Sequence, residues 1–109
     1  MSYAIVQNDL EPDMVLTLSV NGAAEDLSDI DEDAIVLNHK LPDGTTDTLD
    51  LIAVSLPVGQ VKRVWASDDT EIPGRHYGQV TVIRGNGERQ TFPNTKEFFS
   101  WEVIPLIGA

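Results

Sequence analysis

The sequence predicts an all-β fold, specifically an antiparallel β-sandwich of immunoglobulin-like type with about seven strands. Three observations predict it. Apolar and polar residues alternate with a period of two along much of the chain. Turn residues interrupt these runs at intervals of roughly 8–15 residues. The only helix-like apolar spacing, around Leu27, Ile30 and Ala34, is short and rich in Ser and Asp, which limits it to one turn.

The expected strands follow from alternation and from the turns between them. Asn21–Gly22 ends the first strand and Pro42–Gly44 stops the second, since both sequences favour turns. Asn86–Gly87 is predicted to form a hairpin, because both residues tolerate positive φ. The expected strands are Met14–Val20, Ala34–Leu41, Thr48–Ser55, Gln60–Ala66, Arg75–Arg84, Glu88–Asn94 and a last one that begins at Glu97 and ends at Pro105.

The length of 109 residues predicts one domain over residues 1–109. Residues 1–13 are an expected N-terminal arm, and they lack the basic and apolar regions of a signal peptide. Residues 103–109 are unusually apolar for a chain end, so we expect them to complete a sheet or to lie on a neighbouring subunit. No run approaches the length of a membrane span. We expect a soluble product made in a cytoplasm.

Charge and size restrict the partners. Eighteen acidic residues against seven basic ones give a net charge of -11, which repels phosphate backbones and anionic lipids. We therefore expect no nucleic acid and no membrane as partner. A core this small competes with a large substrate cavity, so we expect a protein that is not an enzyme and carries no cofactor. Cysteine is absent, which rules out disulfides and thiolate chemistry.

An acidic loop and a glycine pair have some of the features of binding sites. Asp29, Asp31 and Asp33 match the start of a calcium loop, but Ala34 and Lys40 stand where a glycine and a bidentate glutamate are needed. A solvated acidic loop is the expectation, and a looser calcium site is the alternative. Gly85 and Gly87 form a lone G-x-G without the third glycine or the helix that a phosphate site needs, so a turn is expected.

The histidines and aromatic residues are expected to pack. His39 and His76 have no partner at the spacing of a metal pair, and we expect core packing or a surface position for both. A serine–histidine–acid triad stays open, because its members need not be adjacent in sequence. Aromatic side chains usually fill the core of a small sandwich. This expectation covers Trp65, Tyr77, Phe98, Phe99 and Trp101, and Phe92 as well.

The order of features from Val61 to Pro93 resembles the immunoglobulin-like N-terminal domain of the phage baseplate upper protein family. The resemblance rests on Trp65, Asp68, Pro73, Gly74, Tyr77, Gly87, Thr91, Phe92 and Pro93, together with the upstream segment Val15–Ser28. It extends from about Val15 to Val103. It implies a virion component without catalytic residues, which acts by holding other subunits.

The sequence therefore leads to the hypothesis of a structural component of a tailed-phage virion, at the baseplate or tail tip. Its expected partners are other virion proteins, in several symmetric copies, with a homo-oligomer in the particle. One alternative is a decoration protein on the outside of the capsid. Another is a carbohydrate- or calcium-binding module that uses Trp65 or Trp101 as a stacking platform beside the acidic loop.

Overall fold

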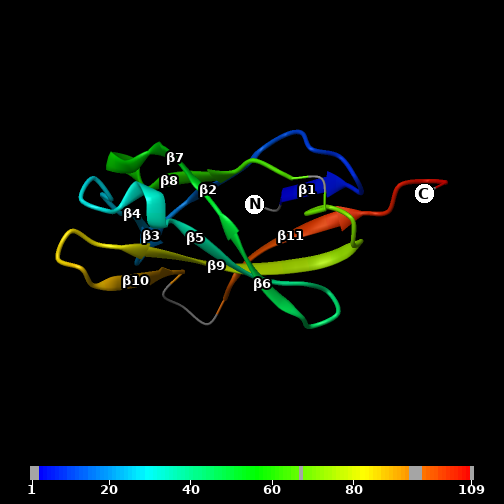
Figure 1. Ribbon diagram of the computed structural model, residues 1–109. Helices are drawn as coiled ribbons and strands as arrows, with labels where there is room; N and C mark the ends of the chain where they lie inside the picture. Colours follow the sequence, from blue (N-terminus) through cyan, green and yellow to red (C-terminus); the bar gives the residue numbers. More distant parts are fainter. Residues whose placement is uncertain (1–2, 67, 94–96, 109) are drawn as a thin grey trace.

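The computed structural model describes residues 3–66, 68–93 and 97–108 (Figure 1). Short strands make up most of the regular structure, as the period-two alternation predicts. Two three-residue 3-10 turns, η1 (Glu32–Ala34) and η2 (Leu56–Val58), are the helical elements of these ranges. The strands are β1 (Tyr3–Val6), β2 (Met14–Thr17), β3 (Ser19–Val20), β4 (Ala23–Ala24), β5 (Val36–Lys40), β6 (Thr46–Asp50), β7 (Ile52–Ser55), β8 (Gln60–Arg63), β9 (Gly74–Ile83), β10 (Arg89–Phe92) and β11 (Phe99–Ile104).

Six strands form the large sheet, in the order β1-β11-β9-β5-β6, with β10 also paired to β9. The ten-residue strand β9 is its longest member: β5 lies along one edge of it, and β11 and β10 follow one another along the other edge. These pairings are antiparallel. The N-terminal strand β1 instead runs parallel to β11, with Tyr3 opposite Trp101 and Val6 opposite Ile104. Residues 3–6 of the predicted arm thus belong to a sheet.

Three strands form the small sheet, in the order β2-β8-β7. It lies over the large sheet, and the chain passes directly from one to the other between β6 and β7 (Figure 1). The crossing point is Leu51, which is buried and whose backbone N–H donates to the carbonyl of Ile35. The predicted single strand Thr48–Ser55 is therefore wrong in one respect: its two halves are β6 and β7, in different sheets.

The core fills the space between the two sheets, because alternate residues of the strands point inward. The large sheet supplies Leu37, Val80, Val82 and Trp101, and the small sheet supplies Met14 and Val61, each of them almost completely buried. Trp65, in the connection after β8, packs into the same core. The prediction of an all-β fold is confirmed.

Turn chemistry explains where the strands end. Asn21 and Gly22 both have positive φ, 52° and 83°, and they link β3 to β4. The predicted strand Met14–Val20 is interrupted at Leu18, because β2 pairs with β8 whereas β3 pairs with β4. The predicted hairpin after β9 is confirmed, but its geometry differs. There only Gly87 has positive φ, while the Asn86 side chain accepts a hydrogen bond from the Glu88 backbone. Asn94, the predicted end of this hairpin, lies outside the described residues.

Candidate functional site

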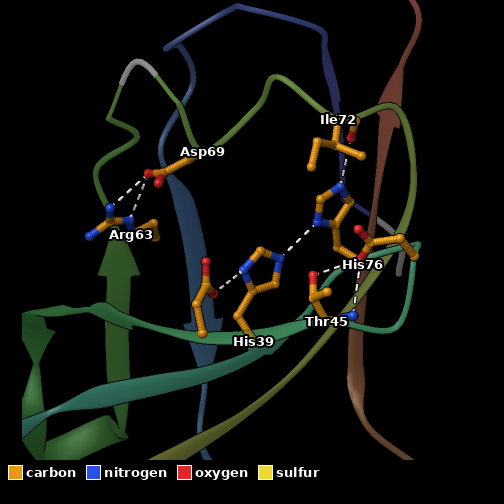
Figure 2. Close-up of polar contacts among 8 residues, drawn as sticks. His39, Thr45, Arg63, Asp69, Ile72 and His76 are labelled. Atoms are coloured by element: carbon orange, nitrogen blue, oxygen red, sulfur yellow. Dashed lines mark hydrogen bonds and ion pairs between the residues drawn. The ribbon is translucent and has the colours of Figure 1, made fainter.

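A group of charged and titratable side chains lies between the two sheets. It consists of His39, Asp47, Arg63, Asp69 and His76 and is called the polar cluster below (Figure 2). These five residues line a cavity of about 330 Å³. His39 and His76 are almost fully buried, with 4% and 1% of their surface exposed. Buried polar groups of this kind are costly unless they are hydrogen-bonded, so their partners decide what the cluster does.

Strand alternation turns both histidines inward. His39 follows the buried Leu37 by two positions on β5, and His76 precedes the buried Val80 by four on β9. Residues at even separations share a face of a strand. In the antiparallel pairing of β5 with β9, His39 is opposite Gly78, so the two imidazoles become diagonal neighbours on the inner face.

One line of hydrogen bonds runs through the two imidazoles (Figure 2). The His39 Nδ1 atom lies 2.7 Å from the Asp47 carboxylate, and His39 Nε2 lies 2.7 Å from His76 Nδ1. His76 Nε2 lies 2.9 Å from the carbonyl oxygen of Ile72. The two rings are inclined by only 14°, so they meet edge to edge, and the indole of Trp101 lies against both at centroid distances of 5.3 and 5.7 Å.

The ends of this line determine how its protons are arranged. The Ile72 carbonyl can only accept, so His76 must carry a proton on Nε2. A neutral His76 then has a lone pair on Nδ1, and the bond between the rings is donated by His39 Nε2. The contact between His39 Nδ1 and Asp47 is a hydrogen bond only if a third proton lies between them. Three hydrogen bonds thus need three protons, one more than two neutral imidazoles and a carboxylate supply.

Burial favours the neutral form of His76. Removal from water lowers the pKa of its imidazole, and the nearby His39 lowers it further, whereas the Ile72 carbonyl and the carboxylates of Asp47 and Glu102 act in the opposite direction. Desolvation is the largest of these effects. This direction agrees with the proton arrangement that the hydrogen bonds require.

The small sheet contributes a partly buried ion pair to the polar cluster. Arg63, on β8, donates from Nε and Nη2 to the same carboxylate oxygen of Asp69, at 3.1 and 2.7 Å, and from Nη1 to the carbonyl of Asp50. That carboxylate oxygen also accepts from the Ala66 backbone at 2.7 Å. Arg63 therefore ties the loop after β8 to the end of β6, and Asp69 is the group that holds it there.

These contacts form two separate groups, because no hydrogen bond or ion pair among the described residues joins the histidine pair to Arg63 and Asp69. All four ring nitrogens of the histidine pair have partners, as do all three nitrogens of Arg63. His39 has the acidic partner that a catalytic triad requires, but its second nitrogen meets His76 instead of a serine hydroxyl. The histidine line joins β5, β6 and β9 within the large sheet, and the bond from Arg63 to the Asp50 carbonyl links the small sheet to it. Of the two positions predicted for the histidines, core packing is confirmed.

Two carboxylates of the acidic loop, Asp29 and Asp31, make contacts within the chain. Asp29 pairs with Arg84 at 2.9 Å and accepts from the Gly85 backbone at 3.1 Å. The Asp31 side chain caps η1 by accepting from the Asp33 backbone. In the described ranges no three His, Cys, Asp or Glu residues are grouped as a metal site would need. The predicted single turn is confirmed as η1, and Gly85 lies against Asp29 in the predicted turn.

The aromatic residues divide between core and surface. Trp65 and Trp101 are buried, at 4% and 0% exposure, so neither offers a stacking platform and that form of the carbohydrate hypothesis is wrong. Phe99 is partly buried, as expected. Tyr77 and Phe98 are exposed instead of packed, because their positions on β9 and before β11 face outward. The expectation of core packing is wrong for these two.

Part of the predicted tail, residues 103–109, belongs to a strand and part of it lies on the surface. Val103 and Ile104 complete β11, and the Leu106 backbone donates to the Gln7 side chain at 3.2 Å. Leu106 and Ile107 are exposed, while Ala109 lies outside the described residues. The part of the tail in β11 thus completes a sheet, which is one of the two predicted outcomes.

Sequence reasoning missed the histidine pair. The alternation of side chains along a strand was the signal that could have found it. His39 lies on the same face of its strand as Leu37, and His76 lies on the same face as Val80 and Val82, so both histidines point inward. Their meeting also depends on the pairing of β5 with β9, which the sequence does not state. Gly78 lies opposite His39 in this pairing, and a Cβ atom there would lie 2.6 Å from Leu37 and 3.2 Å from the Trp101 ring.

Comparisons with known proteins add no relative: no family model, no curated protein and no solved structure matches the chain. In the described part of the chain, none of the helical segments has the length and apolar character needed to cross a membrane.

Proposed function

We propose that this chain is a non-enzymatic structural component of a tailed-phage virion, in which an immunoglobulin-like domain of the baseplate or tail tip holds other subunits through surface contacts. The order of Trp65, Pro73–Gly74, Tyr77 and Phe92–Pro93 supports the phage assignment, because it resembles the baseplate upper protein family. The fold and the surface support the other parts.

Strand order supports the immunoglobulin-like part of the proposal. A variable-type immunoglobulin sandwich has strands G, F, C and C′ in one sheet and B, E and D in the other. Here β11, β9, β5 and β6 occur in the first order, and β2, β8 and β7 in the second. Seven strands thus match, and the crossing at Leu51 corresponds to the passage from C′ to D. The strand β1, the β3–β4 hairpin and β10 are additions to this pattern.

The observation that carries the assembly role is the outer face of the small sheet. Val15 on β2 and Ile52 on β7 are both opposite Lys62 of the central strand β8, and they are 52% and 53% exposed. Val54 and Val64 are exposed nearby, at 48% and 44%. Branched aliphatic side chains gathered on one sheet face are typical of a surface that another protein covers. We propose that this face packs on another virion subunit.

The test is quantitative mass spectrometry of intact particles purified on a density gradient. We expect the chain in a copy number that is a multiple of the symmetry order of the particle. In electron micrographs of the same particles, a labelled antibody against the chain should bind at the tail tip. The variant Ile52→Asp should fold normally but be lost from particles, because it places a charge in the contact. The control Thr46→Asp, on the outer face of the large sheet, should be retained. Finding the wild-type chain only in the free lysate would overturn the proposal.

A further inference from the structure

The outer face of the large sheet has a groove of about 700 Å³ over β5, β6 and β9. It lies on the side of the sheet opposite the polar cluster, and it is not part of the proposed subunit contact. A volume of this size is in the range of small-molecule sites. The lining residues that belong to this outer face are Asn38, Lys40, Thr46, Thr48, Tyr77, Gln79 and Phe98.

Strand register arranges these side chains in two rows. Thr48, Asn38 and Gln79 are opposite one another across β6, β5 and β9, and Thr46, Lys40 and Tyr77 form the next row on the same face. Two residues of extended chain separate the rows, which is about 7 Å. The rows flank the inward-pointing His39, whose contacts with Asp47 and His76 fix the three strands from behind. These contacts join the three strands beneath the groove.

The groove combines open aromatic rings with unused polar groups. Tyr77 and Phe98 are 41% and 50% exposed. The side chains of Thr46, Thr48 and Gln79 form no hydrogen bond with any described residue. Asn38 uses its Nδ2 atom to bond Thr81 and retains its carbonyl oxygen as an acceptor.

This combination fits a sugar. The C–H groups on one face of a pyranose ring carry partial positive charge and pack against the negative face of an aromatic ring. Its hydroxyl groups both donate and accept, as the amide and hydroxyl side chains of the groove do. We propose that the groove binds a short neutral oligosaccharide, with Tyr77 and Phe98 stacking on the sugar rings and Asn38, Gln79 and the threonines bonding the hydroxyls.

Other occupants match the groove less well. A peptide strand would add to a free sheet edge, which β6 offers only at the side of the groove, because the backbone of β5 beneath the groove is already paired on both sides. A nucleic acid or other polyanion would face a chain of net charge -11, with Lys40 as the one cation of the two rows. A purely apolar ligand would leave the amides and hydroxyls without partners.

The test is a titration of the ¹⁵N-labelled chain with cellotetraose, maltotetraose and tetra-N-acetylchitotetraose, followed by heteronuclear NMR. We expect one of the three to shift the backbone amides of Asn38, Tyr77 and Gln79 at millimolar concentration. Tyr77→Ala should weaken that binding about tenfold, since it removes a stacking ring. Phe98→Ala should weaken it independently, and both residues are exposed, so the variants should fold. The matched control Ile52→Ala, on the small sheet, should bind like the wild type.

Three results would overturn the proposal: no shift with any of the three sugars, shifts that lie outside the groove, or binding unchanged in both aromatic variants. Inorganic phosphate serves as a parallel probe. If phosphate shifts the amides around Lys40 and the sugars do not, the groove is an anion site and the proposal is wrong. None of these results depends on whether the chain is found in a virion.

Discussion

The Nε2 atom of His39 lies 2.7 Å from the Nδ1 atom of His76, so two imidazoles from neighbouring strands share a hydrogen bond inside the core. Asp47 and the Ile72 carbonyl stand at the two ends of this pair. Because the Ile72 end can only accept, the direction of the internal bond is determined from that end. The pair thus has a defined arrangement of protons that can be measured.

We expect His76 to hold its proton on Nε2 at neutral pH and His39 to donate from Nε2. The reason is that any other arrangement of a neutral His76 leaves two acceptors facing each other. Long-range ¹H–¹⁵N correlation spectra of the imidazoles measure this directly, because protonated and unprotonated ring nitrogens have different ¹⁵N shifts. A His76 ring protonated only on Nδ1 would contradict the arrangement.

The stability of the fold should fall as the pH drops below about 6.5, the ordinary pKa of histidine. Burial lowers the pKa of His76 in the folded state, so in this range the unfolded chain binds a proton that the folded chain does not. The free energy of unfolding then decreases with falling pH, until the pH reaches the lowered pKa of the folded state. Its slope from this group is at most about 1.4 kcal/mol per pH unit.

Urea unfolding at several pH values measures this slope. The variant His76→Gln controls for the many carboxylates that also titrate in acid, because it lacks the imidazole and keeps them all. We expect a shallower slope for the variant between about pH 6.5 and 5. Equal slopes for the two proteins would show that His76 does not cause the pH dependence.

Gly78→Ala should destabilise the protein by about 1–3 kcal/mol, the usual cost of overpacking. The added Cβ would lie 2.6 Å from the Leu37 Cδ1 atom and 3.2 Å from the Trp101 ring. Leu37→Val removes the closest atom, so Gly78→Ala should cost less in a Leu37→Val background than in the wild type. Urea unfolding of the four proteins tests this, and an unchanged cost would mean that the clash with Leu37 is not the cause.

Asp69→Asn should destabilise the protein by about 3 kcal/mol, because it leaves the largely buried Arg63 guanidinium without its counter-charge. The Asp69 side chain is only 6% exposed, and it receives three hydrogen bonds. The matched control is Glu102→Gln, which breaks the exposed ion pair with Arg75 and should cost less than about 1 kcal/mol. Similar losses for the two variants in urea unfolding would contradict this difference.

Much of the strand pattern could be predicted because local chemistry determines it. β9 follows from a long run rich in β-branched residues, and the turn at Pro42–Gly44 follows from its sequence, with Asp43 accepting from the Thr45 backbone. The change of sheet at Leu51 could not be predicted in the same way. Apolar residues alternate through it without a break, and only the packing of two sheets shows that its flanks belong to different ones.

The polar cluster was less predictable than the strands. The alternation of side chains along each strand places His39 and His76 in the core. Their contact also needs the register of β5 against β9, which depends on residues far apart in sequence. The exposed position of Tyr77 follows from the alternation of side chains along β9. It follows His76 directly, so the inward position of one requires the outward position of the other, and a general preference of aromatic residues for the core does not apply there.

The parallel pairing of β1 with β11 determines how the domain would bear mechanical load. Tyr3 lies beside Trp101 and Val6 beside Ile104, so the start of β1 and the end of β11 lie at opposite ends of this pairing. Tension applied between Tyr3 and Ile104 acts along the strands and loads their hydrogen bonds together, in shear, rather than one after another as in a zipper. A fold joined in this way resists pulling along its length, and it would break first where β1 meets β11.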